Sequence, residues 1–298
     1  MRKILWMLLG GGLAISLTYY LFFKPFEYEI KFKAATVSGD LIETIRIWNR
    51  SLDSAKIIEV DSFYRLTQSI VRKKREYVYD WHFSSVNDSV TVVNIQISEP
   101  NRSLINKILI PFTKQPIEID AREISTVFYE ILKEHLKITS VKILGKTELD
   151  SSFCVCRSLA TYQVDKANGM MRDYPILTTF IDVHKLSIAG PPSVRIREWD
   201  HNKGSLAFDF CFPIKPSSSL PIVDSLFYKN FKKEKVIWAE YHGNYITSDR
   251  AWYELMSYAN KNGYKVTGLP IEYFYNNPNL GLSQDMWKAE VYLPVGDK

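Results

Sequence analysis

The last sixty residues of the chain follow a pattern that specifies the order strand, helix, strand, strand. Residues 236–241 are a β-branched and aromatic run, residues 249–262 have apolar side chains at helical spacing, and residues 271–275 and 288–293 are again strand-like. Gly263 is expected to end the helix, because glycine is the usual residue just after a helix C-terminus. The apolar helix face needs a sheet to cover it, so this order predicts an α+β fold.

An earlier segment repeats this layout in the same order. Three stretches recur: residues 153–162 in 236–245, residues 190–192 in 268–270, and residues 209–214 in 290–295. Such self-similarity predicts two copies of one unit, at about residues 150–214 and 233–295. If the sheets of the two copies join, they leave a concave seam. Asp209 and Glu290 then occupy equivalent positions in the two copies.

The second copy carries three short motifs. An aromatic, His-Gly-Pro-Tyr-like turn stands at residues 242–245, a Gly-x-Pro-x-Glu-Tyr element at residues 268–273, and a closing Glu-x-x-x-Pro-Val at residues 290–295. Together they resemble the GyrI-like effector-binding family, whose members end multidrug-responsive transcription regulators or stand alone. The resemblance covers residues 148–295, about half of the chain. Asn244 replaces the usual proline of the turn, and the first copy matches only loosely.

The resemblance implies a pocket between the two copies in which a glutamate, here Glu290, meets cationic or polar aromatic ligands. A carboxylate in an apolar cleft is poorly solvated, so it favours a cationic partner. Aromatic rings around such a ligand add about 0.5 to 2 kcal/mol each through cation–π contacts. The ligand-binding residues that this hypothesis names are Glu290, Tyr245, Trp252, Tyr273, Tyr275 and Asp209.

The residues themselves leave alternatives open. Side chains alternate along a strand, so Glu290 shares a face with Tyr292 and lies either in the seam or in water. Tyr245 and Trp252 could equally serve core packing, as large aromatic side chains usually do.

Two other functions compete with ligand binding. Some relatives in the family are reported as hydrolases, so Glu290 is also a candidate general acid or base, with Tyr245 or His242 close enough to share a proton. No catalytic residue is assigned on this basis. The third reading is a structural envelope protein with a vestigial pocket.

The N-terminus carries an uncharged run of twenty residues that begins at Ile4 and ends at Phe23. At 1.5 Å per residue it reaches about 30 Å, enough to cross a bilayer. The run is long for a signal peptide and no small-x-small cleavage site follows it, so we expect an uncleaved single-pass anchor over residues 1–25. The basic residues on its two sides nearly balance. The short tail with Arg2 and Lys3 favours a cytoplasmic N-terminus and an exported, periplasmic globular part.

Residues 26–146 predict a separate domain. The expected elements are a strand at 28–35, a helix from Ser38 or Asp40 to Leu52, strands at 56–60, 64–72, 76–84 and 89–98, and a helix from Asp120 with Glu123 completing a capping box. This order resembles the helix-grip domains of the SRPBCC or polyketide-cyclase superfamily, without a sequence motif. It implies either a cavity or an ordinary filled core. Residues 147–298 form the predicted effector-binding domain.

Charge and cysteine content exclude some classes of partner. The net charge of +5 is scattered, and the sequence shows no helix-turn-helix or basic stripe, so no nucleic acid is expected. No pattern of metal ligands or cofactor motif is present. Cys154 and Cys156 share a strand face and are poorly placed to bridge each other, whereas a bond from either to Cys211 is possible. The ligand's identity and the oligomeric state stay open.

Overall fold

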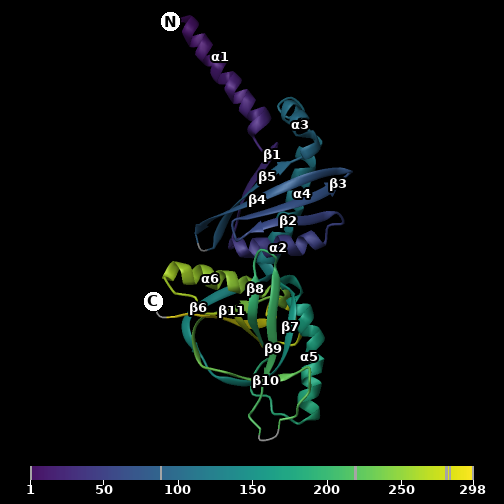
Figure 1. Ribbon diagram of the computed structural model, residues 1–298, viewed down its shortest axis with the longest axis vertical. Coiled ribbons are helices and arrows are strands. Elements are labelled where there is room, and N and C mark those ends of the chain that lie inside the picture. Colours follow the sequence, from purple (N-terminus) through teal and green to yellow (C-terminus); the bar gives the residue numbers. More distant parts are fainter. Residues whose placement is uncertain (1, 88, 218–219, 279–280, 282, 297–298) are drawn as a thin grey trace. The chain divides into compact units, whose positions relative to one another are not determined.

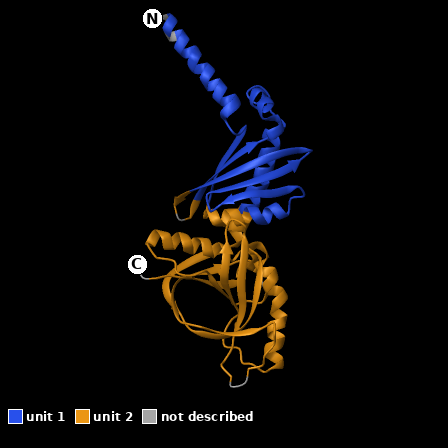
Figure 2. Cartoon of the chain, viewed as in Figure 1, with its two compact units in different colours: residues 1–34, 45–84, 91–132 blue, residues 35–44, 85–90, 133–298 orange. Residues whose placement is uncertain are grey.

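The computed structural model describes residues 2–87, 89–217, 220–278, 281 and 283–296. The ends of the predicted anchor (residue 1) and of the predicted C-terminal domain (297–298) lie outside the described residues. The chain forms two compact units, shown in different colours in Figure 2. Unit 1 comprises residues 1–34, 45–84 and 91–132, and unit 2 comprises residues 35–44, 85–90 and 133–298. Two antiparallel sheets with helices confirm the predicted mixed α+β class.

The apolar N-terminal run is helical. Helix α1 (Arg2–Thr18) continues directly into a π-helical turn, η1 (Tyr19–Phe23). The 18 residues Trp6–Phe23 are apolar enough to cross a membrane, and none of this stretch is buried against the rest of the chain. Leu13, for example, is 73% exposed. The helix therefore has the length and composition of a membrane span.

The first sheet has five antiparallel strands in the order β1-β5-β4-β3-β2. These are β1 (Tyr28–Ala34), β2 (Ala55–Asp61), β3 (Arg65–Arg72), β4 (Arg75–Asn87) and β5 (Val90–Ser98). The accompanying helices are α2 (Ser38–Arg50), α3 (Ser103–Leu109) and α4 (Pro116–Ile138). Alternate residues of β5 are buried, and Trp81 packs edge-on against Trp48 and Phe128 with ring centroids 6.4 and 4.9 Å away. Aromatic packing between sheet and helices thus builds this core.

Two details of this region differ from the sequence prediction. Helix α4 begins at Pro116 rather than Asp120, because proline suits the first helical turn and the Glu118 carboxylate accepts the Gln115 backbone N–H at 2.8 Å. Glu123 therefore does not cap the helix, and its carboxylate pairs instead with Arg72. The short helix α3 was not predicted at all.

The second sheet has eight antiparallel strands in the order β10-β7-β9-β8-β12-β13-β11-β6. Its strands are β6 (Ser140–Leu149), β7 (Ser152–Tyr162), β8 (Ser193–Asp200), β9 (Ser205–Pro213), β10 (Phe227–Phe231), β11 (Glu234–His242), β12 (Ile271–Phe274) and β13 (Lys288–Pro294). The order strand, helix, strand, strand occurs at β7, α5 (Lys166–Val183), β8 and β9, and again at β11, α6 (Arg250–Asn262), β12 and β13. Strands β8 and β12 pair where the two groups meet.

The two faces of this sheet have different roles. Figure 1 shows the sheet strongly bent, with α5 and α6 packed along it. Side chains on the face that these helices cover, here the helix face, join helix side chains in one core cluster, which includes Phe208 and Val291 of the sheet and Leu255 of α6. The other face, here the open face, carries Tyr273 and Tyr292, which join a separate small cluster. Because side chains alternate along a strand, each strand contributes to both faces.

Candidate functional site

A cavity of about 460 Å³ opens on the helix face of unit 2, between α5 and the segments that follow β11 and β12. This volume lies within the range of small-molecule sites in proteins. The residues that line it are Ala167, Met170, Met171, Tyr174, Pro175, Pro192, Phe210, Asn244, Tyr245, Ile246, Phe274, Asn276, Asn277, Pro278 and Trp287. Its walls are thus mainly apolar and aromatic, with asparagine amides and tyrosine hydroxyls as the polar groups.

Tyr245 is the best anchored of the aromatic wall residues. It lies in the short 3-10 helix η4 (Tyr245–Thr247), and its ring packs against Phe274 and Trp287 with centroids 4.7 and 5.4 Å away. Its hydroxyl donates to the Lys288 carbonyl at 2.8 Å and accepts the Asn276 backbone N–H at 3.1 Å. Burial raises the pKa of Tyr245 to about 12, so the phenol is neutral at physiological pH.

Helix α5 supplies the opposite wall. Met170 is almost buried whereas Met171 is 53% exposed, so the two side chains line the inner part and the mouth of the cavity. Methionine side chains are flexible and polarisable, and they adapt to ligands of different shape. Pro175 lies inside the helix and also lines the cavity.

Close to this wall lies an ion pair that is completely buried. The Lys166 ammonium contacts the Glu272 carboxylate, and both side chains have no exposed surface. Lys166 directly precedes the lining residue Ala167, and Glu272 shares the helix face of β12 with the lining residue Phe274. The two charges neutralise each other, and neither side chain lines the cavity.

Hydrogen bonds satisfy the remaining capacity of the Glu272 carboxylate. One oxygen accepts from Ser248 Oγ at 2.8 Å and from Trp252 Nε1 at 3.0 Å. The Lys166 ammonium also lies 4.6 Å from the Trp252 ring centroid. The negative charge of Glu272 is thus neutralised inside the protein, which is the usual condition for burying a carboxylate.

Glu290 lies on the open face, away from the cavity. Its register partner on β12 is Tyr273, and its carboxylate accepts hydrogen bonds from the hydroxyls of Tyr275 at 2.6 Å and Tyr292 at 2.7 Å. Lys288 Nζ approaches it at 3.2 Å. Burial and the hydrogen bond to Glu290 raise the pKa of Tyr275 well above its usual value. Glu290 and Tyr275 are therefore in contact, on the other side of the sheet from Tyr245.

The remaining predicted residues are spread over both faces. On the open face, the Tyr273 hydroxyl accepts a hydrogen bond from Arg195 at 2.8 Å. Asp209 is buried there too, 2.8 Å from Arg197 and 3.4 Å from Lys229. Trp252 lies on the helix face against Glu272. The structure thus divides the predicted residues between the two faces of the sheet. Strand alternation directs Glu290 to the open face, whereas η4 directs Tyr245 to the helix face.

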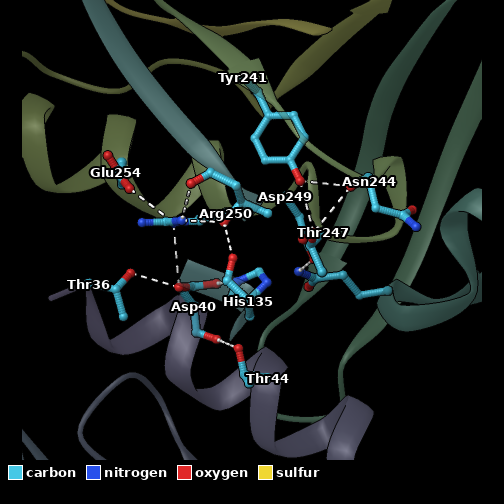
Figure 3. A network of polar contacts seen from close by, with 12 residues as sticks. Thr36, Asp40, Thr44, His135, Tyr241, Asn244, Thr247, Asp249, Arg250 and Glu254 are labelled. Atoms are coloured by element: carbon cyan, nitrogen blue, oxygen red, sulfur yellow. Dashed lines mark hydrogen bonds and ion pairs between the residues drawn. The ribbon is translucent and has the colours of Figure 1, made fainter. Parts of the chain in front are cut away.

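The start of α6 is held by a second polar network, shown in Figure 3. Arg250 Nε lies 3.6 Å from Asp40 and 3.3 Å from Glu254. Asp40 accepts hydrogen bonds from Thr36 at 2.7 Å and lies 3.0 Å from His135 Nε2. Burial favours its neutral form, yet the hydrogen bond and charge of His135 together with Arg250 keep the pKa of Asp40 below its usual value. Burial raises the pKa of Glu254 to about 7.

Comparison with known protein families finds a match for the C-terminal part of the chain. Residues 174–296 match the model of the GyrI-like small molecule binding domain, which confirms the resemblance found in the sequence. Residues 174–296 therefore carry a GyrI-like small molecule binding domain. The family match includes α5 from residue 174 onward, η4, α6, β12 and β13, and thus most of the cavity wall.

Several solved structures are similar to this chain. The EcmrR C-terminal domain is 14% identical with a TM-score of 0.46, covering 54% of this chain and 99% of that one. A structure of SAV2435 bound to tetraphenylphosphonium is 15% identical with a TM-score of 0.38, covering 51% and 92%. A hydrolase from Listeria innocua is 12% identical with a TM-score of 0.37, covering 55% and 98%. No curated protein matches the chain.

Proposed function

We propose that this protein binds a small, uncharged organic molecule in the cavity between α5 and η4, and that α1 tethers the binding domain to a membrane. The observation that carries the proposal is the cavity itself, which has the volume of a small-molecule site and is lined mostly by residues of the GyrI-like domain. Its aromatic and methionine walls suit an apolar or aromatic body, and Asn244, Asn276 and Asn277 can offer hydrogen bonds to a polar substituent.

The charge of the ligand follows from the residues around the cavity. Among the described residues that line it, none has a charged side chain. The buried Glu272 close to the wall is already paired with Lys166. A cationic ligand would lose its hydration without gaining a carboxylate partner, and cation–π contacts of about 0.5 to 2 kcal/mol each with the aromatic wall offset only part of that cost. The cation preference inferred from the sequence depended on Glu290, whose carboxylate lies on the open face with Lys288 as its neighbour.

The surroundings of Glu290 also favour binding over hydrolysis as the role of this domain. Two tyrosine hydroxyls donate hydrogen bonds to its carboxylate, and Lys288 Nζ lies 3.2 Å from it, so its oxygens are engaged within the protein. His242 lies 3.0 Å from Glu240, and Tyr245 lies on the other face of the sheet. Neither proton-sharing partner that a Glu290-based hydrolase needs is therefore in contact with it.

Ligand screening of the full-length protein in lipid nanodiscs tests the proposal. Thermal shift and native mass spectrometry should detect uncharged aromatic compounds in preference to cationic dyes. Met171→Trp places a larger side chain at the cavity mouth and should weaken binding of any hit by about tenfold or more, equivalent to about 1.4 kcal/mol. Because Met171 is half exposed, this variant should fold.

Val183→Trp is the matched control, since Val183 is exposed near the end of the same helix and does not line the cavity. It should bind the hits like the wild type. Equal affinities of both variants, or a hit list made of cations only, would contradict the proposed site.

A further inference from the structure

Helix α3 and the turn after it have an inverted distribution of side chains. Leu104, Ile105, Ile108 and Leu109 are between 38% and 46% exposed, and Phe112 is 82% exposed. The buried residues of the helix are the polar ones, Asn106 and Lys107. A surface helix of a water-soluble domain has the opposite pattern, with its apolar side turned to the core. This patch, called here the α3 patch, is therefore built to meet an apolar environment.

Specific hydrogen bonds fix the inverted orientation. The Asn106 amide donates to Glu99 Oε2 at 2.8 Å, and Glu99 is also approached by Arg75 at 3.4 Å. Ser103 Oγ, at the start of the helix, donates to Glu27 Oε1 at 2.6 Å. Rotating α3 to bury its leucines and isoleucines would break these bonds and leave buried polar groups unpaired, which is costly. The outward direction of the apolar side chains is thus part of the fold.

The same helix is bound to the end of the apolar N-terminal segment. Lys107 Nζ donates to the carbonyl oxygens of Lys24 at 2.5 Å and Leu21 at 3.3 Å. In return, the Tyr20 hydroxyl donates to the Lys107 carbonyl at 3.1 Å. The last residues of η1, Phe22 and Phe23, are themselves 67% and 69% exposed. The α3 patch therefore lies beside the point where the apolar helix ends.

We infer that the α3 patch enters the interfacial layer of the same bilayer that α1 spans. Aromatic and aliphatic side chains at the end of a span sit at headgroup depth, and the bilayer is the apolar phase that already meets Phe22 and Phe23. Exposed basic residues bound the patch on both sides, Arg102 before it and Lys114 after it, and can reach lipid phosphates. This inference rests on the proposed membrane tether but is independent of the ligand cavity.

Site-directed spin labelling tests the inference in full-length protein reconstituted into phosphatidylcholine–phosphatidylglycerol vesicles. A nitroxide at Phe112→Cys replaces an exposed side chain, while Cys154 is buried and Cys156 is bonded to Cys211, so the label goes to the new thiol. Collision with oxygen, which concentrates in lipid, is compared with collision with the water-soluble Ni(II)-EDDA complex. Leu13→Cys serves as the reference for the span, and Ile222→Cys, 92% exposed in unit 2, as the reference for water.

The measured quantity is the ratio of the collision rate with oxygen to the collision rate with the nickel complex. We expect this ratio at position 112 to be at least severalfold higher than at position 222, and closer to the ratio at position 13 than to the ratio at position 222. A ratio at 112 equal to that at 222, with position 13 still lipid-exposed, would overturn the inference while leaving the tether intact. Water exposure at position 13 as well would overturn both. Protection of position 112 from both reagents would mean that protein, such as a second copy of the chain, covers the patch, and would also overturn the inference.

Discussion

At the scale of single residues, Lys166 supplies the positive charge that neutralises the buried Glu272. Its ammonium is the counter-ion of Glu272 in a completely buried pair. Lys166→Met removes the partner and leaves an uncompensated buried carboxylate, so the free energy of unfolding should fall by about 3 to 5 kcal/mol. In the fraction that folds, Glu272 becomes available to a cationic ligand. Urea denaturation and titration with a cationic dye measure the two effects.

The double variant Lys166→Met/Glu272→Gln is the control for this prediction. It removes both charges together, so most of the lost stability should return while the gained affinity for cations disappears. A single variant that is as stable as the double variant, or one that folds without gaining any affinity for cations, would show that Lys166 does not act as an internal counter-ion.

Glu290 and Glu272 show how much the sequence alone could predict about single residues. The alternation around Glu290 correctly separates it from Val291 and Leu293, which are buried in the core cluster of the helix face. Alternation alone does not tell which face of the sheet holds a cavity. Glu272 stands in the Gly-x-Pro-x-Glu-Tyr motif, so its position was visible. Its partner Lys166 lies 106 residues away, and only the fold brings the two charges together.

At the scale of elements, the polar network at the start of α6 makes stability depend on pH. Burial raises the pKa of Glu254 to about 7, from the ordinary value of 4.5 for a glutamate in the unfolded chain. Between these two pH values the folded protein holds a proton that the unfolded chain has lost, so the free energy of unfolding decreases as pH rises through this window. The shift corresponds to about 3 kcal/mol in total.

Glu254→Gln mimics the protonated side chain and should remove most of this decrease. Chemical denaturation at pH 5 and at pH 8 measures the free energy of unfolding. Between these pH values the free energy of unfolding of the variant should fall by about 2 to 3 kcal/mol less than that of the wild type. Glu198→Gln changes an exposed carboxylate of β8 in the same unit and should behave like the wild type. Parallel pH dependence of the wild type and Glu254→Gln would contradict the prediction.

The elements that the sequence predicted well are those whose apolar side chains face the core. The ranges expected for the strands and the helix near the C-terminus agree with β11, α6, β12 and β13 to within a few residues. Helix α3 was missed because its apolar side chains face outward, so a core-facing pattern does not describe it. The start of α4 was misplaced because Asp120 resembles a helix cap. Its carboxylate is instead buried in the core, where it accepts a hydrogen bond from the Tyr77 hydroxyl at 2.9 Å.

At the scale of the whole molecule, a disulfide bond is relevant to the question of which side of the membrane holds the globular part. Cys156 on β7 and Cys211 on β9 are register partners and form a bond, and Cys154 is a free, buried thiol. Disulfides persist mainly in oxidising compartments. A cytoplasmic N-terminal tail with an exported globular part would place the bond in such a compartment, and this is the orientation that the short basic tail favours.

Thiol counting on protein taken from its own membranes tests this orientation. Under denaturing conditions, a maleimide–polyethylene glycol reagent should add one adduct before reduction and three after it, because only Cys154 is free. Three adducts before reduction would place the globular part in a reducing compartment.

Cys211→Ser removes the bond between residues 55 apart and should lower the free energy of unfolding by about 4 kcal/mol in the chain-entropy model, whereas Cys154→Ser leaves the bond in place. If the bond forms only after export, Cys211→Ser should lower the free energy of unfolding of protein isolated from membranes, and should not lower it for protein kept reduced. The stability of unit 2 would then depend on the side of the membrane on which it lies.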